Sequence, residues 1–143
     1  TWPEVKRQLV DTGQVRMVWR DFPLDRTALA AAAVARALPP ERYEGFIGIL
    51  LNTQDRWAFR PDAIDELQKM AALAGLSRQQ FEVVRNDEPY LRAILAGRME
   101  AEREFQIQAT PSFAFQSGGR TRMHGGNMPF EQFQRLVQEV RRG

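Results

Sequence analysis

The stretch Ala109-Thr110-Pro111-Ser112-Phe113-Ala114-Phe115 decides the fold class of this 143-residue chain. Its last four residues are a short apolar run that is typical of a β-strand, and the proline before them marks where that strand begins. Ser117-Gly118-Gly119 then supplies turn residues, and Arg120 to His124 can form a second strand. The sequence therefore predicts a β-hairpin near the C-terminus.

The parts of the chain on either side of this hairpin extend the pattern. After a loop at Gly125-Gly126-Asn127, apolar residues at helical spacing predict a final helix over Pro129 to Arg142. At the other end, Thr1 to Thr12 predicts a helix that stops at Gly13. Alternating apolar and polar residues predict a strand over Gln14 to Phe22. A strand, a distant hairpin and flanking helices indicate an α/β protein and not a pure helical bundle.

The long middle of the chain, from Asp25 to Phe105, shows helical patterns and no convincing strand. Asp25 is a candidate N-cap, and the sequence from Ser77 to Gln80 has the pattern of a capping box. We expect Leu91, Ile94, Leu95 and Met99 to form the buried side of the last of these helices. The predicted helices cover Asp25–Leu38, Glu41–Thr53, Asp62 to Gly75, a short piece from Ser77, and Asp87 to Phe105.

Composition excludes several classes of function. The chain is 43% hydrophobic and 27% charged with a net charge of +2, which is ordinary for one globular domain. Its basic residues are mixed with acids along the whole chain, so solvated helix faces explain them better than a nucleic-acid surface. No apolar run is long enough for membrane insertion. The start of the chain lacks both a signal peptide and an initiator Met, so we expect a mature or trimmed polypeptide.

The complete absence of cysteine is the most restrictive feature of the composition. It excludes disulfides, thiolate metal sites and cysteine nucleophiles within these residues. We therefore expect no catalytic residue among the 143, no metal site and no cofactor.

Four segments, in order along the chain, resemble DsbA-type thioredoxin-like proteins, which are thiol–disulfide oxidoreductases. The resemblance implies an α/β, thioredoxin-like fold with a large all-helical insertion. Residues 1–25 and 106–143 would form the thioredoxin-like domain, and residues 26–105 the inserted helical domain. Val15–Leu24 is similar to the family's second strand, Phe46–Trp57 to its helical insertion, Ala109–Phe113 to its cis-proline segment, and Gly125–Phe133 to the entry into its last helix.

The chain departs from the family at its beginning. The resemblance implies a Cys-X-X-Cys pair at the N-terminus of the first helix, where the helix dipole and free N–H groups stabilise a thiolate. A strand precedes that pair in the family, and both are expected upstream of Thr1. The absent strand would be the first and central one, between Val15–Phe22 and Ser112–Phe115, leaving unpaired backbone groups on both neighbours. A rearranged sheet or a strand supplied by a partner chain are the alternatives.

The best candidate site is the segment Ala109, Thr110 and Pro111. The resemblance implies that the bond before Pro111 is cis, and that Thr110 offers backbone groups to an extended substrate peptide. His124 is the only histidine, and a surface or packing role suits it better than a metal or catalytic role. Helix caps are the simplest explanation for most carboxylates near turns. These are Asp21, Asp55, Asp62, Asp65 and Glu66.

Three functions follow from the resemblance. The first is a thiol–disulfide oxidoreductase whose cysteines lie upstream of Thr1. The second is a redox-inactive peptide-binding or chaperone module. The third is an enzyme similar to kappa-class glutathione transferases or isomerases. The first implies protein or peptide substrates with thiols or disulfides, a membrane redox partner, and a periplasmic or cell-envelope location, where disulfides persist.

Overall fold

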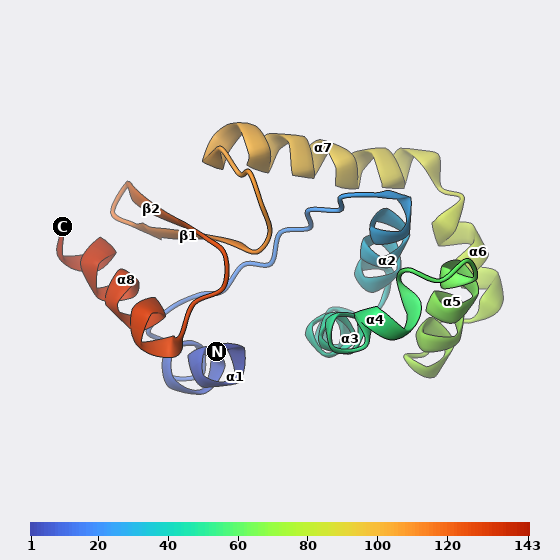
Figure 1. The fold of residues 1–143 in the computed structure, drawn as a ribbon, viewed down its shortest axis with the longest axis horizontal. Helices are drawn as coiled ribbons and strands as arrows, with labels where there is room; N and C mark the ends of the chain where they lie inside the picture. The colour runs from blue at the N-terminus through green and yellow to red at the C-terminus, as the bar shows by residue number, and fades with distance from the viewer. The chain divides into compact units, whose positions relative to one another are not determined.

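The computed structural model describes all 143 residues, which form two compact units (Figure 1). Thr1–Arg20 and Glu100–Gly143 make up the sheet unit, and Asp21–Met99 make up the helical unit. None of the helices combines the length and the apolar character needed to cross a lipid bilayer. The elements are α1 (Trp2–Val5), a π-helical turn η1 (Lys6–Val10), α2 (Arg26–Ala37), α3 (Pro40–Asn52), α4 (Gln54–Trp57), α5 (Ala63–Leu73), α6 (Arg78–Arg85), α7 (Glu88–Phe105), β1 (Ser112–Ser117), β2 (Arg120–Gly125) and α8 (Phe130–Arg142).

The hairpin of the sheet unit confirms the prediction from its turn residues. β1 and β2 pair antiparallel, with Ser117 opposite Arg120, and only Gly118 and Gly119 lie between them. These glycines have φ values of +56° and +79°. A two-residue turn with positive φ at both positions matches the twist of the flanking strands, and glycine reaches that conformation without steric cost.

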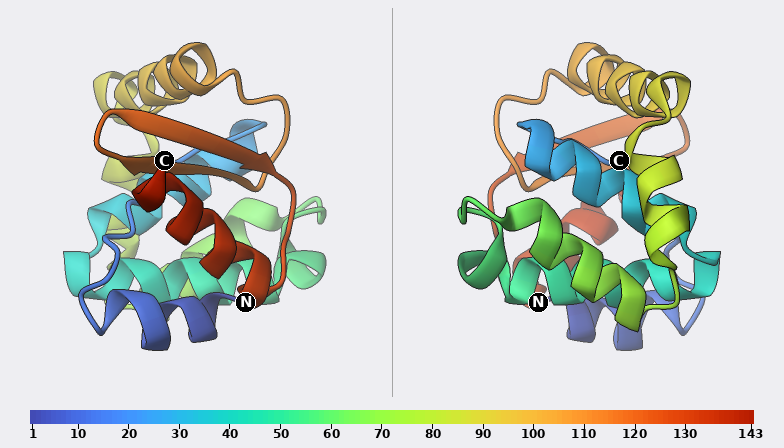
Figure 2. Two further views of the ribbon diagram at one scale, coloured as in Figure 1. Left: turned by 90° about the vertical axis from the view of Figure 1, so that its left-hand side faces the viewer. Right: turned by 90° about the vertical axis from the view of Figure 1, so that its right-hand side faces the viewer.

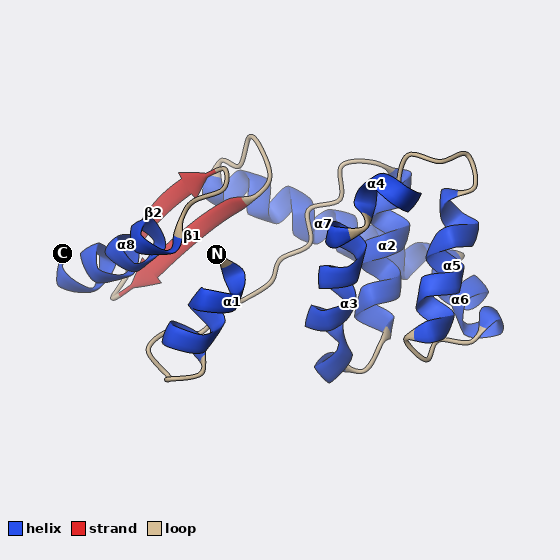
Figure 3. Ribbon diagram, turned by 60° about the horizontal axis from the view of Figure 1, so that its bottom comes forward, coloured by secondary structure: helices blue, strands red, loops and turns tan.

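The core of the sheet unit forms where α8 lies against β1 and α1 lies against α8 (Figure 3). The Phe133 ring of α8 meets the rings of Phe113 and Phe115 edge-on, at centroid distances of 5.9 and 4.8 Å. From the N-terminal helix, Val5 and Leu9 are almost fully buried in the same cluster. Edge-on packing of aromatic rings adds to the stabilisation from burial alone.

The helical unit is built around α2, and its predicted helix starts are confirmed. The Asp25 side chain accepts a hydrogen bond from the Ala28 N–H at 2.8 Å. Ser77 and Gln80 form a reciprocal capping box at the start of α6. Small residues on α2 let the neighbouring helices approach closely, and α3, α5 and α6 all pack on it (Figure 2). Phe81 and Leu67 are the largest side chains fully buried there.

The predicted strand over Gln14 to Phe22 is wrong. The segment is extended and its side chains alternate, with Val15, Met17 and Trp19 half-buried and the residues between them exposed, but it pairs with no strand. The sheet contains only β1 and β2. A sequence can have the alternation of a strand and still lack a ladder, because a ladder needs a neighbour with free backbone groups.

Two further details differ from the sequence-based expectations. On α7, Leu95 is 37% exposed and Met99 is 68% exposed, and Ala101 is the helix's one buried residue. Apolar spacing marks a face of a helix, but it does not supply the element that must cover that face. The short helix α4 was also not predicted, because four residues are too few to show a helical period.

The boundaries between the two units lie at residues 20/21 and 99/100. Both fall a few residues before the boundaries expected from the sequence. The second boundary lies inside α7, so one continuous helix contributes residues to both units.

Candidate functional site

The candidate site lies in the loop that connects α7 to β1. The Thr110–Pro111 peptide bond is cis, as the resemblance implied. Two hydrogen bonds hold the ends of the segment: Ser112 Oγ donates to the Ala109 carbonyl at 2.6 Å, and the Gly126 N–H donates to the Pro111 carbonyl at 2.8 Å. Ala109, Thr110 and Pro111 themselves are exposed. The loop is therefore fixed at both ends and open to solvent between them.

The backbone N–H and carbonyl of Thr110 are free to bind an approaching peptide. Neither its N–H nor its carbonyl makes a hydrogen bond within the protein. A peptide that approaches in an extended conformation can pair with both groups, as in strand addition. The geometry thus permits the role that the resemblance gives to Thr110.

The start of α1 lies at the same end of the sheet unit as this loop. Thr1, the N-cap residue, donates its hydroxyl to the carbonyl of Met128 at 2.6 Å. Met128 is buried, and it is two residues from Gly126, which bonds Pro111. A group placed just before Thr1 would therefore be close to the Pro111 loop.

The acidic side chain in the first turn of α1 is Glu4. Hydrogen bonds from Gln8 and Arg7 lower the pKa of Glu4 below its usual value. An anionic side chain is favourable at a helix N-terminus, because the exposed N–H groups there carry partial positive charge. The Glu4 carboxylate is partly exposed and is bonded to Arg7 and Gln8, one turn further along the chain.

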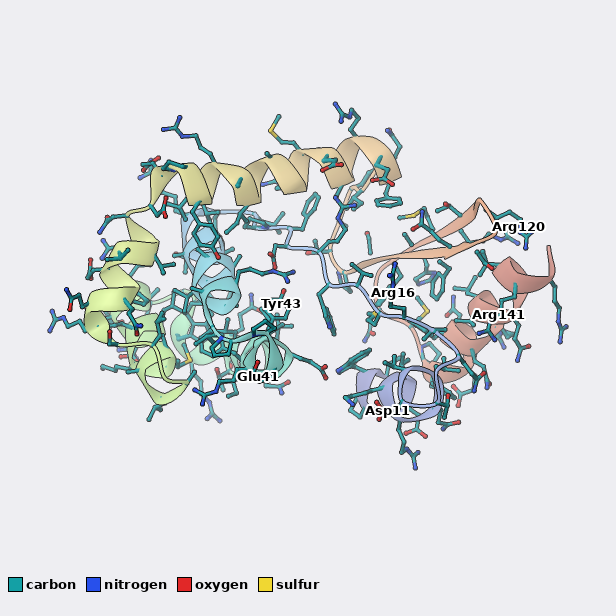
Figure 4. All side chains as sticks on the ribbon, turned by 180° about the vertical axis from the view of Figure 1, so that it is seen from behind. Asp11, Arg16, Glu41, Tyr43, Arg120 and Arg141 are labelled. Carbon is teal, nitrogen blue, oxygen red and sulfur yellow. The ribbon has the colours of Figure 1, made fainter.

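One cluster, in the helical unit, was missed by the sequence analysis. Asp21 accepts hydrogen bonds from the Tyr43 hydroxyl at 2.8 Å and from Arg36 Nε at 2.7 Å. The Arg36 guanidinium also stacks 3.9 Å from the centre of the Tyr43 ring. Tyr43 is labelled in Figure 4. Burial, followed by the hydrogen bond to Asp21, raises the pKa of Tyr43 above its usual range. Asp21 therefore links the chain before α2 to Arg36 of α2 and Tyr43 of α3, and it is not a helix cap.

The other predicted side chains have local structural roles. His124 is half-buried, with Nδ1 3.5 Å from Nε2 of Gln132. Asp62 precedes α5 but does not cap it, because its carboxylate binds the Arg60 guanidinium at 2.7 Å. No group of three or more His, Cys, Asp or Glu side chains is placed to hold a metal ion.

Comparison with known proteins supplies the family. The sequence profile of a family described as Thioredoxin matches residues 1–139. Proteins of Rickettsia conorii and Rickettsia typhi, both named as candidate protein-disulfide oxidoreductases, are 27% and 26% identical over 121 residues. The alignments cover 84% of this chain but only 43% and 44% of those proteins. This chain thus spans less than half the length of these two relatives.

Solved structures give the same result for the fold. The crystal structure of α-DsbA1 from Wolbachia pipientis matches with a TM-score of 0.86 and 26% identity, covering 98% of this chain and 75% of that one. A variant of the same protein with two cysteines replaced by alanine matches with the same TM-score and 27% identity, over 98% and 74%. The fold is thioredoxin-like with a large helical insertion, and the chain belongs to the thioredoxin family, among its DsbA-type members.

Proposed function

We propose that this chain is part of a DsbA-type thiol–disulfide oxidoreductase, with its cysteine pair on residues that precede Thr1. The main support is the match to α-DsbA1 across 98% of the chain, together with the names of the relatives. The 143 residues contain no cysteine and so carry no redox chemistry of their own. Their contribution is to bind and orient the substrate.

In the proposed reaction, a thiolate attacks one sulfur of a disulfide, and a mixed disulfide forms as the other sulfur leaves as a thiolate. The second cysteine of the pair, as a thiolate, then attacks the first cysteine's sulfur in the mixed disulfide. The pair closes into a disulfide, and the substrate sulfur leaves as a thiolate; the reverse sequence oxidises a substrate. A cysteine just before Thr1 would lie at the N-terminal end of the first helix, where free N–H groups lower a thiol pKa. It would also be near Pro111, through the contacts of Met128 and Gly126.

The substrate site in this proposal is the segment Ala109, Thr110 and Pro111. The unpaired Thr110 backbone would hold the substrate as an added strand, which brings its sulfur to the end of the first helix. The substrates would be proteins or peptides with thiols or disulfides. A membrane redox partner would return the cysteine pair to its starting redox state after each reaction. The proposed location is the periplasm or cell envelope, where disulfides persist.

The test is the intact mass of the protein isolated from its own cells, with thiols titrated after reduction and denaturation. We expect a mass above 16.4 kDa, the mass of these 143 residues, and two titratable thiols. The same sample should oxidise or reduce a cysteine-containing unfolded protein. A protein with fewer than two thiols would refute the proposed activity.

A second candidate, a peptide-binding module without redox chemistry, is favoured by the absence of cysteine and by the free Thr110 backbone. Titration of the isotope-labelled protein with an unfolded peptide separates the two. Shifts of the Thr110 amide signal that are the same with and without reductant, in a protein free of thiols, would support the binding module.

A further inference from the structure

The positive charge of the chain is concentrated in the sheet unit. Thr1–Arg20 and Glu100–Gly143 contain ten Lys and Arg side chains and seven Asp and Glu side chains, a net charge of +3, whereas the helical unit carries −1. β1 has the hairpin turn, Gly118 and Gly119, at one end and the Pro111 loop at the other. We call these the turn end and the Pro111 end, because the charges differ between them.

Four arginines that are distant in sequence meet at the turn end. Arg120 and Arg122 follow the turn on β2, and Arg141 and Arg142 are the last residues of α8. The two pairs are in contact, because Arg120 Nη2 donates to the carbonyl of Arg141 at 3.1 Å. Figure 4 shows Arg120 and Arg141 at this end of the sheet unit. The fold therefore gathers basic residues that the sequence distributes along the chain.

A fifth arginine, Arg16, comes from the extended segment, which we define as residues 14–18. Arg141 donates to the carbonyl of Gln14, so this segment begins at the turn end. Arg16 is exposed, and together with Arg141 it lines a groove of about 470 Å³ between the extended segment and β1. The turn-end arginines are thus Arg16, Arg120, Arg122, Arg141 and Arg142.

Acidic side chains do not neutralise this cluster. Two carboxylates lie near it, and each already has a basic partner: Glu139 binds Arg122 at 3.3 Å, and Asp11 binds Lys6 at 2.9 Å. Arg120 and Arg141 donate to backbone carbonyls, which carry no net charge. The turn end therefore keeps a surplus of positive charge.

A hollow between the hairpin and the end of α8 gives the cluster a place for an anionic group. Its volume is about 360 Å³, and Arg120, Thr121, Arg122 and Val140 contribute to its lining. Guanidinium groups bind phosphate oxygens through two parallel N–H bonds, and a threonine hydroxyl can add a third donor. The hollow thus has the size and the donors to receive a phosphate group.

The Pro111 end has a different character. Glu4 lies in the first turn of α1, and Glu131 lies in the first turn of α8. Both helices start at this end, because Thr1 binds the carbonyl of Met128, just before α8. β1 has six residues, so the two ends are about 20 Å apart. The sheet unit is therefore basic at the end that is far from the candidate site.

The surface of the turn end resembles a headgroup-binding surface more than a protein interface. The most buried part of a protein interface is usually apolar and rich in aromatic residues. The turn end exposes arginines, the two turn glycines and Thr121, and none of the large exposed apolar side chains belongs to residues 116–122 or 138–143. Its attraction for a partner is consequently electrostatic.

We propose that the turn-end arginines dock the protein reversibly on a membrane surface of anionic phospholipids, without insertion into the bilayer. Each arginine close to such a surface strengthens binding about 5-fold, so the cluster acts as a unit. Docking by the turn end leaves the Pro111 loop about 20 Å from the lipid and open to protein substrates. The proposal goes beyond the proposed function and does not need the cysteines.

The first test is sedimentation of the full-length protein with lipid vesicles. We expect binding to vesicles of phosphatidylglycerol and phosphatidylcholine in equal parts, and much weaker binding to phosphatidylcholine alone. Binding should weaken as the ionic strength rises from about 0.05 M to about 0.5 M, because salt screens exposed charges. Equal binding to both kinds of vesicle would overturn the proposal, and so would binding of a poly-glutamate peptide in place of the anionic vesicles.

A matched pair of double variants shows whether the turn end is the docking surface. Arg122→Gln with Arg142→Gln should weaken binding to the anionic vesicles by about 10- to 30-fold. The control, Arg78→Gln with Arg92→Gln, removes the same charge from exposed positions on α6 and α7 and should weaken it much less. Equal losses in the two double variants would mean that only net charge matters, and would overturn the proposal.

A paramagnetic lipid headgroup in the same vesicles reports which end faces the membrane. The amide signals of Gly118 and Gly119 should broaden strongly, and those of Thr110 and Gly126, at the Pro111 end, should not. Equal broadening of the four signals would overturn the proposal. The outcomes are separate from the proposed function: two thiols without docking would overturn only this proposal, and docking in a protein without thiols would refute only the redox activity.

Discussion

The helical unit and the sheet unit satisfy their backbones in different ways. In the helical unit, each helix pairs its own peptide groups, and its ends are closed by side chains such as Asp25 and Ser77. In the sheet unit, β1 has a partner on one side only, and the extended segment has none. Helices complete their hydrogen bonds locally, whereas a strand depends on chain that is distant in sequence. The backbone hydrogen bonds of the helical unit are therefore more completely satisfied within the unit than those of the sheet unit.

The cores of the two units differ in the same sense. Small residues of α2, several of them completely buried, let α3, α5 and α6 converge around Phe81 and Leu67. The sheet unit instead relies on aromatic rings, with Phe133 set between Phe113 and Phe115. The same rings border the groove beside β1, so the core of the sheet unit is open on one side.

Removing a ring from the closed core should have the largest effect. Phe81 is 1% exposed, so Phe81→Ala leaves a cavity in the helical unit and should lower the free energy of unfolding by about 3–5 kcal/mol. Phe59→Ala is the matched control, because Phe59 is 79% exposed, and a change within about 0.5 kcal/mol is expected. Urea unfolding measures both losses when it is followed by the NMR signal of the Trp57 indole N–H, which is buried in the helical unit. Similar losses for the two variants would contradict the closed core.

A smaller effect is expected from the contact that ties the hairpin to α8. Arg120 Nη2 donates to the carbonyls of Val140 and Arg141 at 2.8 and 3.1 Å. A cation at this helix C-terminus satisfies free carbonyls, so Arg120→Ala should lower the free energy of unfolding by about 0.5–1 kcal/mol. Thermal unfolding measures the loss.

Arg122→Ala is the control for Arg120→Ala. Arg122 lies on the same strand and makes only an exposed ion pair with Glu139, at 3.3 Å. Its removal should change stability by less than about 0.5 kcal/mol. If the two variants were equally stable, the capping of α8 by Arg120 would contribute nothing.

The same contrast between local and distant partners explains how far the sequence could predict the fold. Apart from the short α4, the helices from α2 to α7 follow from apolar spacing, N-caps and breakers, all of which act within a few residues. The hairpin follows from Gly118 and Gly119 in the same way. The extended segment shows the limit, because Val15 to Trp19 alternate as a strand does and no strand lies beside them.

The candidate site shows a similar limit. Its cis bond before Pro111 was expected from family resemblance, and nothing in the local residues requires it. The role of Asp21, in contrast, was not expected from resemblance or from local sequence, because its partners Arg36 and Tyr43 lie 15 and 22 residues away along the chain. No local pattern marks these three residues as partners, so only the folded chain reveals the cluster.

This cluster yields the last prediction, which concerns the ionisation of tyrosine at high pH. Burial is the main cause that raises the pKa of both tyrosines, Tyr43 and Tyr90, and Asp21 raises the pKa of each further. The folded protein should therefore hold both phenol protons at pH values where free tyrosine, with a pKa of about 10, has lost its own. A titration by tyrosinate absorbance should show no ionisation near that pH until the protein unfolds.

The sign of the accompanying stability change follows from linkage. The pKa values of Tyr43 and Tyr90 are raised in the folded state. Their contribution to the free energy of unfolding is therefore fully present below the unfolded pKa of about 10, and it is lost as the pH rises above that value toward the folded pKa. Tyr90→Phe leaves Tyr43 as the only reporter, and adding Asp21→Asn to it should lower the pKa of Tyr43, because the hydrogen bond to a charged carboxylate is gone. Burial of the ring remains, so the pKa should stay above that of free tyrosine. If Tyr43 titrated as a free phenol in the Tyr90→Phe variant, neither its burial nor its bond to Asp21 could persist in solution.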